Sequence, residues 1–135
     1  MSRLVVDTNI IVSSFLSSGP PRVILNRIRD RQDLLCVSRA VLREYLEVLT
    51  RAGVARELLE ALLSVLQDPQ RLMLVLPSRR LTVVREDPAD DMFLECALEA
   101  EADYIISGDR HLRRLGIFEG IEILSPRAYL TRVER

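Results

Sequence analysis

Two aspartates directly follow apolar runs that have the length and composition of buried strands. Asp7 follows residues 3–6 in "RLVVD", and Asp109 follows residues 103–108 in "DYIISGD". A buried carboxylate is costly unless something pairs with it, so each position needs an explanation. The carboxyl ends of parallel strands meet at one edge of a sheet, and we expect Asp7 and Asp109 to lie together there if their strands are neighbours.

Two further carboxylates are predicted to face the same region from helices. At about 100° per residue, Glu44 lies on the border of the apolar stripe of a helix over 39–51, whereas Arg43 and Glu47 point away from it. In "DPADD" (87–91), Asp90 lies on the apolar side of the helix that follows. Asp91 lies on the other side, which we expect to face solvent.

Acidic residues in the first turn of a helix also complement its dipole and need no other role. We expect only this role for Asp87, where the aspartate caps the helix and Pro88 suits its first turn. For Asp91 a dipole role and a site role are equally open.

Four carboxylates without a supporting histidine or cysteine indicate a site for a hard cation. Like charges repel and raise each other's pKa unless a cation lies among them. Oxygen ligands suit Mg²⁺ or Mn²⁺ rather than zinc, and such ions activate water and stabilise the charge that develops on a phosphodiester. The predicted chemistry is therefore metal-dependent phosphodiester cleavage. The predicted set is Asp7, Glu44, Asp90 and Asp109.

The alternation of periodicities predicts an α/β fold. Strands are expected over 3–6, 34–37, 103–108 and 121–124, with one or two short β pieces in 71–86. Helices are expected over 9–16, 21–32, 39–51, 55–67 and 87–101, with a short helix or turn at 109–115 and a last helix after Ser125 and Pro126. Strands that alternate with helices imply a three-layer α/β/α sandwich with a mainly parallel central sheet.

Composition narrows the function classes further. The chain of 135 residues, 48% hydrophobic, predicts a single domain over 1–135, and no apolar run or leader segment predicts a membrane protein or a secreted one, so we expect a soluble cytoplasmic protein. All 19 basic residues are arginine, which excludes chemistry that needs a lysine. The net charge of −1 limits nucleic-acid binding to a local patch. Cys36 and Cys96 are predicted to be buried thiols.

Four segments together resemble the PIN-domain nucleases, particularly the toxin components of bacterial and archaeal toxin–antitoxin systems related to VapC. The segments are "VVDTNIIVS" (5–13), "SRAVLREYLEVL" (38–49), "DPADDMFLECALEAEADYIISGD" (87–109) and "ILSPRAYL" (123–130). The resemblance implies a PIN-like fold and a Mg²⁺- or Mn²⁺-dependent endoribonuclease. Its catalytic and metal-binding acids fall on Asp7, Glu44, Asp90 and Asp109, and its supporting polar groups fall on Thr8, Asn9, Ser107 and Asp91.

The resemblance also implies an RNA substrate, an antitoxin protein that restrains the enzyme, and a homodimer. Broad apolar stripes on the helices at 20–32 and 54–67 agree with self-association, although core packing explains them equally well. Thr8 and Asn9 are also possible N-caps of the next helix. Arginines near the predicted edge are candidates for holding backbone phosphates. They are Arg22, Arg39, Arg43 and Arg110.

Two positions depart from the family pattern. His111 stands where many members have an acid, and we expect a surface side chain there. Glu101 stands where a glycine is common, which we expect to change only a helix end. Two other functions are weighed against the nuclease. One is a non-catalytic PIN-fold module that binds RNA or protein, and the other is a phosphatase with Asp7 as nucleophile, which the missing lysine and the sequence "DTN" disfavour.

Overall fold

A six-stranded sheet forms the centre of the molecule. The structure, a computed structural model, describes residues 1–84 and 88–134. The strand order is β3-β2-β1-β4-β6-β5, and every neighbouring pair is parallel except β5 and β6. The strands are β1 (Ser2–Val6), β2 (Asp33–Ser38), β3 (Leu72–Val75), β4 (Tyr104–Ile106), β5 (Ile117–Phe118) and β6 (Ile121–Leu124).

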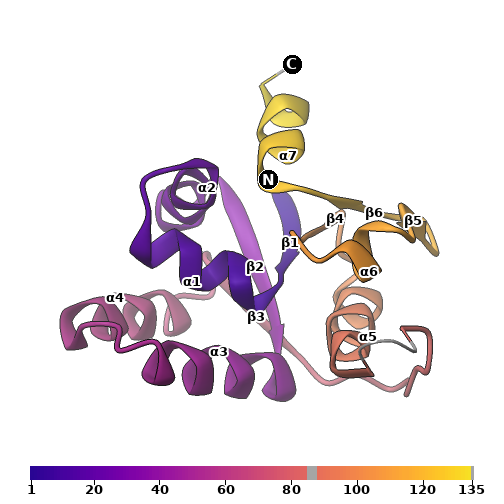
Figure 1. Cartoon of the computed structure of the whole chain (residues 1–135), viewed down its shortest axis with the longest axis horizontal. Helices are drawn as coiled ribbons and strands as arrows, with labels where there is room; N and C mark the ends of the chain where they lie inside the picture. Colours follow the sequence, from indigo (N-terminus) through magenta and orange to yellow (C-terminus); the bar gives the residue numbers. More distant parts are fainter. Residues whose placement is uncertain (85–87, 135) are drawn as a thin grey trace.

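Helices cover both faces of this sheet. They are α1 (Thr8–Leu16), α2 (Pro20–Arg29), α3 (Arg39–Arg51), α4 (Arg56–Leu66), α5 (Asp91–Ala100), α6 (Arg110–Arg113) and α7 (Pro126–Val133), and a 3₁₀ turn over Pro88–Asp90 leads into α5. Helix α2 contacts β2, α1 and α7, whereas α5 contacts β1 to β4. Figure 1 shows α1 and α2 on one side of β1 and β2, with α5 on the other. The predicted α/β/α sandwich with a mainly parallel sheet is confirmed.

The strands that carry the candidate acids are buried because they lie in the middle of the sheet. All six residues of β2 are buried, as are the last three of β1. Cys36 and Cys96 are free, buried thiols, as predicted. Burial raises the pKa of each thiol to about 12, so neither is a nucleophile at neutral pH. No helix in the described parts of the chain is long and apolar enough to span a bilayer.

Element boundaries differ from the predicted ones where turns intervene. Strand β4 ends at Ile106 rather than at 108, and α2 ends at Arg29 rather than at 32, where Arg31 takes a positive φ of 60°. The two-residue strand β5 was not predicted, because it is too short to show a period. The predicted caps of α3 and α7 are confirmed, since Ser38 and Ser125 accept from backbone amides of those helices.

A buried ion pair joins α2, β2 and α7 at the amino end of β2. Asp33 is fully buried and accepts hydrogen bonds from Arg27 Nε and from the Tyr129 hydroxyl, both at 2.7 Å. These contacts satisfy a carboxylate that would otherwise be costly to bury. They hold two helices against the sheet at the edge opposite the candidate acids.

Glu101 ends α5 in a left-handed conformation, with φ 51° and ψ 49°. A side chain with a Cβ atom is strained there by about 1 kcal/mol relative to glycine. Glu101 thus lies at a helix end, as expected. We predict that Glu101→Gly raises the free energy of unfolding by about 1 kcal/mol in urea denaturation. The exposed helical position Glu99 is the control, because Glu99→Gly is expected to lower it by about 1 kcal/mol. A loss of stability in Glu101→Gly would contradict the prediction.

Candidate active site at the carboxyl edge of the sheet

Asp7 joins the end of β1 to the start of α1. Asp7 is 4% exposed, and its Oδ1 accepts a hydrogen bond of 3.0 Å from the Ile10 backbone amide, so Asp7 is the N-cap of α1. Thr8 and Asn9, the alternative caps considered from the sequence, lie inside the helix. The other oxygen, Oδ2, accepts a hydrogen bond from the Ser107 hydroxyl.

Ser107 brings Asp7 and Asp109 together. Strands β1 and β4 are neighbours, with Val6 opposite Ile106, as the adjacency of the two aspartates requires. The Ser107 hydroxyl donates to Asp7 and accepts from the Asp109 backbone amide at 2.9 Å. Asp109 Oδ1 in turn accepts from the His111 amide at 2.6 Å and caps α6. Both aspartates are therefore fixed by the turns that begin their helices.

The Asp7 carboxyl is electrostatically unfavourable as an anion. Burial raises its pKa above the ordinary value, and the charge of Asp109 raises it further, against the opposing effect of the hydrogen bonds from Ser107, Ile10 and Gly108. Within residues 1–84 and 88–134, no arginine or histidine forms an ion pair with Asp7 or Asp109. A cation beside these two acids would relieve that cost.

Glu44 approaches the same region from α3. It is half-buried, and its Oε2 accepts a hydrogen bond of 3.3 Å from the Thr8 hydroxyl, at the first residue of α1. The neighbouring Tyr45 is fully buried and donates its hydroxyl proton to the Val6 carbonyl, which fixes α3 against the end of β1. Glu47 is exposed, as the helical wheel predicts.

Asp90 is buried as predicted, but the prediction for Asp91 is wrong. Asp90 is 7% exposed at the start of α5, and Asp91 is only 6% exposed. The Asp91 Oδ1 accepts hydrogen bonds of 3.0 Å from the amides of Val83 and Val84. The irregular segment 76–84 covers this side of α5, which a helical wheel cannot show. Asp87 lies outside the described residues.

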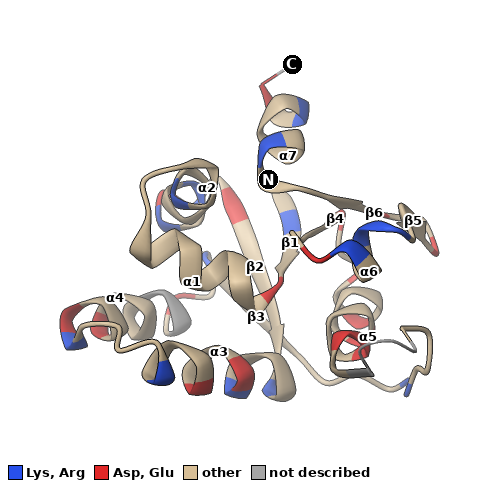
Figure 2. Ribbon diagram, in the orientation of Figure 1, with Lys and Arg blue, Asp and Glu red and all other residues tan. Residues whose placement is uncertain are grey.

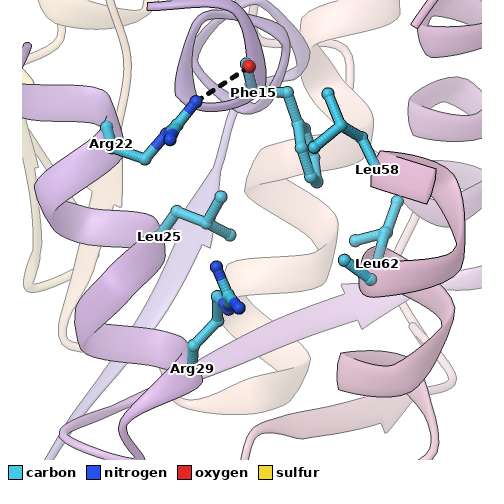
Figure 3. Close-up of a pocket in the computed structure, with 7 residues that line it drawn as sticks. Phe15, Arg22, Leu25, Arg29, Leu58 and Leu62 are labelled. Atoms are coloured by element: carbon cyan, nitrogen blue, oxygen red, sulfur yellow. Dashed lines mark hydrogen bonds between the residues drawn. The ribbon is translucent and has the colours of Figure 1, made fainter. Parts of the chain in front are cut away.

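The expected arginines occupy different environments. Arg22 donates to the Ser14 and Phe15 carbonyls at the end of α1, and Figure 3 shows it beside an apolar pocket between α1, α2 and α4. The Arg22 guanidinium therefore joins α2 to the end of α1, and we do not assign it to a phosphate. Arg39, Arg43 and Arg110 are exposed. Figure 2 shows only basic residues on α2, α6 and α7, only acidic residues on α5, and both kinds on α3 and α4.

His111 is half-buried rather than a surface side chain, and its Nδ1 is buried without a hydrogen-bond partner among the described residues. The expectation of an exposed histidine is therefore wrong. Its ring lies on α6, whose first residues are fixed by Asp109.

The carboxyl edge offers oxygen donors, the ligands that Mg²⁺ and Mn²⁺ prefer. The adjacent carboxylates of Asp7 and Asp109 suit such an ion, because a cation beside them would offset the repulsion between their two negative charges. In the described part of the chain, no three His, Cys, Asp or Glu side chains are grouped closely enough to hold a metal. The geometry therefore provides two adjacent acids. Glu44 reaches the start of α1 through Thr8, and Asp90 is buried where the 3₁₀ turn meets α5, but among the described residues neither forms a group of three with the pair.

The raised pKa of Asp7 predicts a stability gain on neutralisation. Because the folded pKa is raised, the contribution of Asp7 to stability is fully present below its unfolded pKa of about 3.9 and is lost as the pH rises through the folded value. We expect Asp7→Asn to raise the Tm in EDTA at pH 7, since asparagine caps a helix as well as aspartate. The gain should vanish as the pH falls to about 4.

The control for this measurement is Asp103→Asn, at the opposite edge, where the exposed carboxylate accepts from the Arg3 amide. This variant should not show the same pH-dependent gain. A lower Tm of Asp7→Asn at pH 7 would contradict the assignment of burial as the dominant effect on Asp7.

Comparison with known proteins agrees with the fold. A family model described as "PIN domain" matches residues 3–111, a range that includes all four candidate acids. No curated protein matched the chain. PIN domains are generally nucleases and usually use divalent metal ions. Because the match covers most of its length, the chain belongs to the PIN-domain family.

Proposed function

We propose that this protein is a Mg²⁺- or Mn²⁺-dependent endoribonuclease. The observation that carries the proposal is the pair Asp7 and Asp109, held together by Ser107 at the ends of two neighbouring parallel strands. One of the two acids is buried, and its pKa is raised. Such an arrangement is destabilising by itself and favours a bound cation.

Asp7 and Asp109, linked through Ser107, are the first proposed metal ligands. Glu44 and Asp90 are proposed as further ligands from the resemblance to PIN-domain nucleases, since no three acids are grouped in the described residues. The ion, when bound, activates water and stabilises the charge that develops on the phosphodiester. Ser107 orients the Asp7 carboxylate, and Thr8 orients Glu44 through its hydroxyl. Asn9 is exposed at the start of α1 and is proposed to contact groups on the solvent side of the site. Asp91 is proposed to act indirectly, through its hydrogen bonds to the segment 76–84.

The biological setting is proposed from the family resemblance. RNA is the proposed substrate, and the enzyme is the proposed toxin of a toxin–antitoxin pair that acts in the cytoplasm as a single PIN-like domain over residues 1–135. A homodimer is supported by exposed apolar side chains on adjacent helices, which are Leu16, Val23 and Leu63. Arg39, Arg43 and Arg110 are proposed phosphate contacts.

The alternatives make different demands on the site. A non-catalytic RNA- or protein-binding module is favoured by the lack of three closely grouped acids in the described residues. A phosphatase with Asp7 as nucleophile is disfavoured, because both oxygens of Asp7 accept hydrogen bonds and the side chain is buried.

Cleavage of a mixed RNA pool tests the proposal. Wild type should cut with Mg²⁺ or Mn²⁺ and not with EDTA. Because each substitution removes a charged ligand, Asp7→Asn and Asp90→Asn should each lower the rate at least about 100-fold. Asp103→Asn, at the opposite edge of the sheet, should cut RNA as wild type does. Asp91→Asn shows whether Asp91, the sequence neighbour of Asp90, also takes part in cleavage.

Absence of cleavage by folded wild type with either metal would overturn the nuclease, provided that calorimetry also detects no binding of Mg²⁺ or Mn²⁺. The binding module would then be the function to pursue.

A further inference from the structure

A groove lies beside the candidate active site at the same edge of the sheet. We call it the arginine groove, and it is lined by Ser38, Arg39, Val75, Leu76, Arg79 and Arg80, with a volume of about 240 Å³. Ser38 ends β2 and Val75 ends β3. Strand β2 is the neighbour of β1, and two strand spacings of about 4.8 Å place β3 about 10 Å from β1. The groove is therefore adjacent to the edge that carries Asp7.

Two guanidinium groups in the groove are available to a ligand. Arg39 and Arg80 are exposed, and neither makes an ion pair or hydrogen bond with the described residues. Arg79 is already bound by the Glu119 carboxylate through two bonds of 3.0 and 3.1 Å. Glu95, the acid that also lines the groove, accepts the Leu81 amide at 2.8 Å. Glu95 keeps its negative charge, but the two unpaired guanidinium groups of Arg39 and Arg80 outnumber it, so the groove carries a net positive charge.

Apolar side chains lie next to these cations. Leu76 is 73% exposed and lines the groove, and Leu74, in the adjoining strand β3, is 55% exposed. Guanidinium groups bind phosphate oxygens in a bidentate manner, while apolar side chains contact the faces of bases that are not stacked in a duplex. A surface with both properties fits a single-stranded nucleic acid, whose bases are free to turn toward the protein.

The wall of the groove is held in place by three carboxylates. Segment 76–84 has no regular secondary structure, yet its backbone and side chains are bound at three points. Glu119 binds Arg79, Glu95 binds the Leu81 amide, and Asp91 binds the amides of Val83 and Val84. An irregular segment fixed in this way loses little further entropy when a ligand binds. The groove is therefore preformed, and this gives the buried Asp91 a physical role.

We propose that the arginine groove binds single-stranded RNA, with backbone phosphates on Arg39 and Arg80 and a base against Leu76. The strand then continues along the sheet edge toward Asp7 and Asp109. The inference rests on the proposed function in taking RNA as the polymer, but it concerns binding and not cleavage.

Fluorescence anisotropy with a labelled single-stranded RNA of about 12 nucleotides tests the groove. EDTA is present throughout, so that binding is measured without cleavage, and the salt concentration runs from about 50 to about 200 mM. The double variant R39A/R80A should raise the Kd about tenfold at the lowest salt. The slope of log K against log salt should fall in magnitude by about 1.4, because each phosphate contact on a single strand contributes about 0.7.

Two controls separate specific from general effects. Arg56→Ala removes one arginine from α4, where the side chain is 89% exposed and pairs with Glu60, and it should leave the Kd and slope unchanged. Leu76→Ser should weaken binding without changing the salt slope, since it removes a base contact and no charge. R39Q/R80Q, which keeps long polar side chains, should behave as the alanine pair if charge is the cause. Unfolding midpoints equal to that of wild type establish that the variants are folded.

The outcomes distinguish this inference from the proposed nuclease. Loss of affinity in R39A/R80A supports the groove even if the wild type cuts no RNA, in which case only the nuclease proposal fails. Unchanged affinity and slope in that variant overturn the groove even if the wild type cleaves RNA. Equal competition by duplex RNA or by single-stranded DNA of the same length overturns single-stranded RNA as the ligand, as does a wild type that binds no RNA.

Discussion

The buried carboxylate of Asp7 is the constraint around which the rest of the structure is arranged. It caps α1, and through Ser107 it fixes the turn between β4 and α6. Helix α3 reaches the same point, because Tyr45 donates to the last carbonyl of β1 and Glu44 accepts from Thr8. Strand β1, helices α1 and α3 and the β4–α6 turn therefore meet at one carboxylate whose charge is unfavourable. Such a site is expected where a residue is kept for activity at a cost in stability.

A second buried aspartate shows why Asp7 is exceptional. Asp33 is as well buried, but it has an arginine and a tyrosine hydroxyl as partners, which satisfy its charge within the protein. Asp7 has neutral donors and an acidic neighbour instead. The carboxylate charge of Asp33 is thus balanced by an arginine at one edge of the sheet, whereas that of Asp7 is not balanced by a cationic side chain of the described residues at the other. This difference, rather than burial, separates a structural carboxylate from a candidate ligand.

The sequence predicts those parts of the structure that depend on local periodicity and on strand order. The adjacency of Asp7 and Asp109 follows from one rule for parallel sheets, and the caps at Ser38 and Ser125 follow from residue type. The role of Asp91 could not be predicted, because a helical wheel assumes that only the core covers a helix. Segment 76–84 has no period of its own, so its path over α5 is set by hydrogen bonds to side chains of α5 that lie 14 and 8 positions further along the chain. Arg22 binds two carbonyls at the end of α1, an interaction that spacing alone does not indicate.

Charge is distributed unequally along the carboxyl edge of the sheet. The acids lie at the ends of β1 and β4, whereas Arg39 and Arg80 lie beside the ends of β2 and β3. A polyanion is repelled by the acidic half unless a cation is present, but it is attracted by the basic half in either case. In the proposed function, affinity for a nucleic acid therefore comes from the ends of β2 and β3, and reaction with it from the neighbouring strands β1 and β4. The irregular segment of the basic half is held by Asp91 and Glu95 of α5 and by Glu119 of the β5–β6 turn. None of these three carboxylates is a proposed metal ligand, so the acidic and the basic half are positioned by different sets of acids.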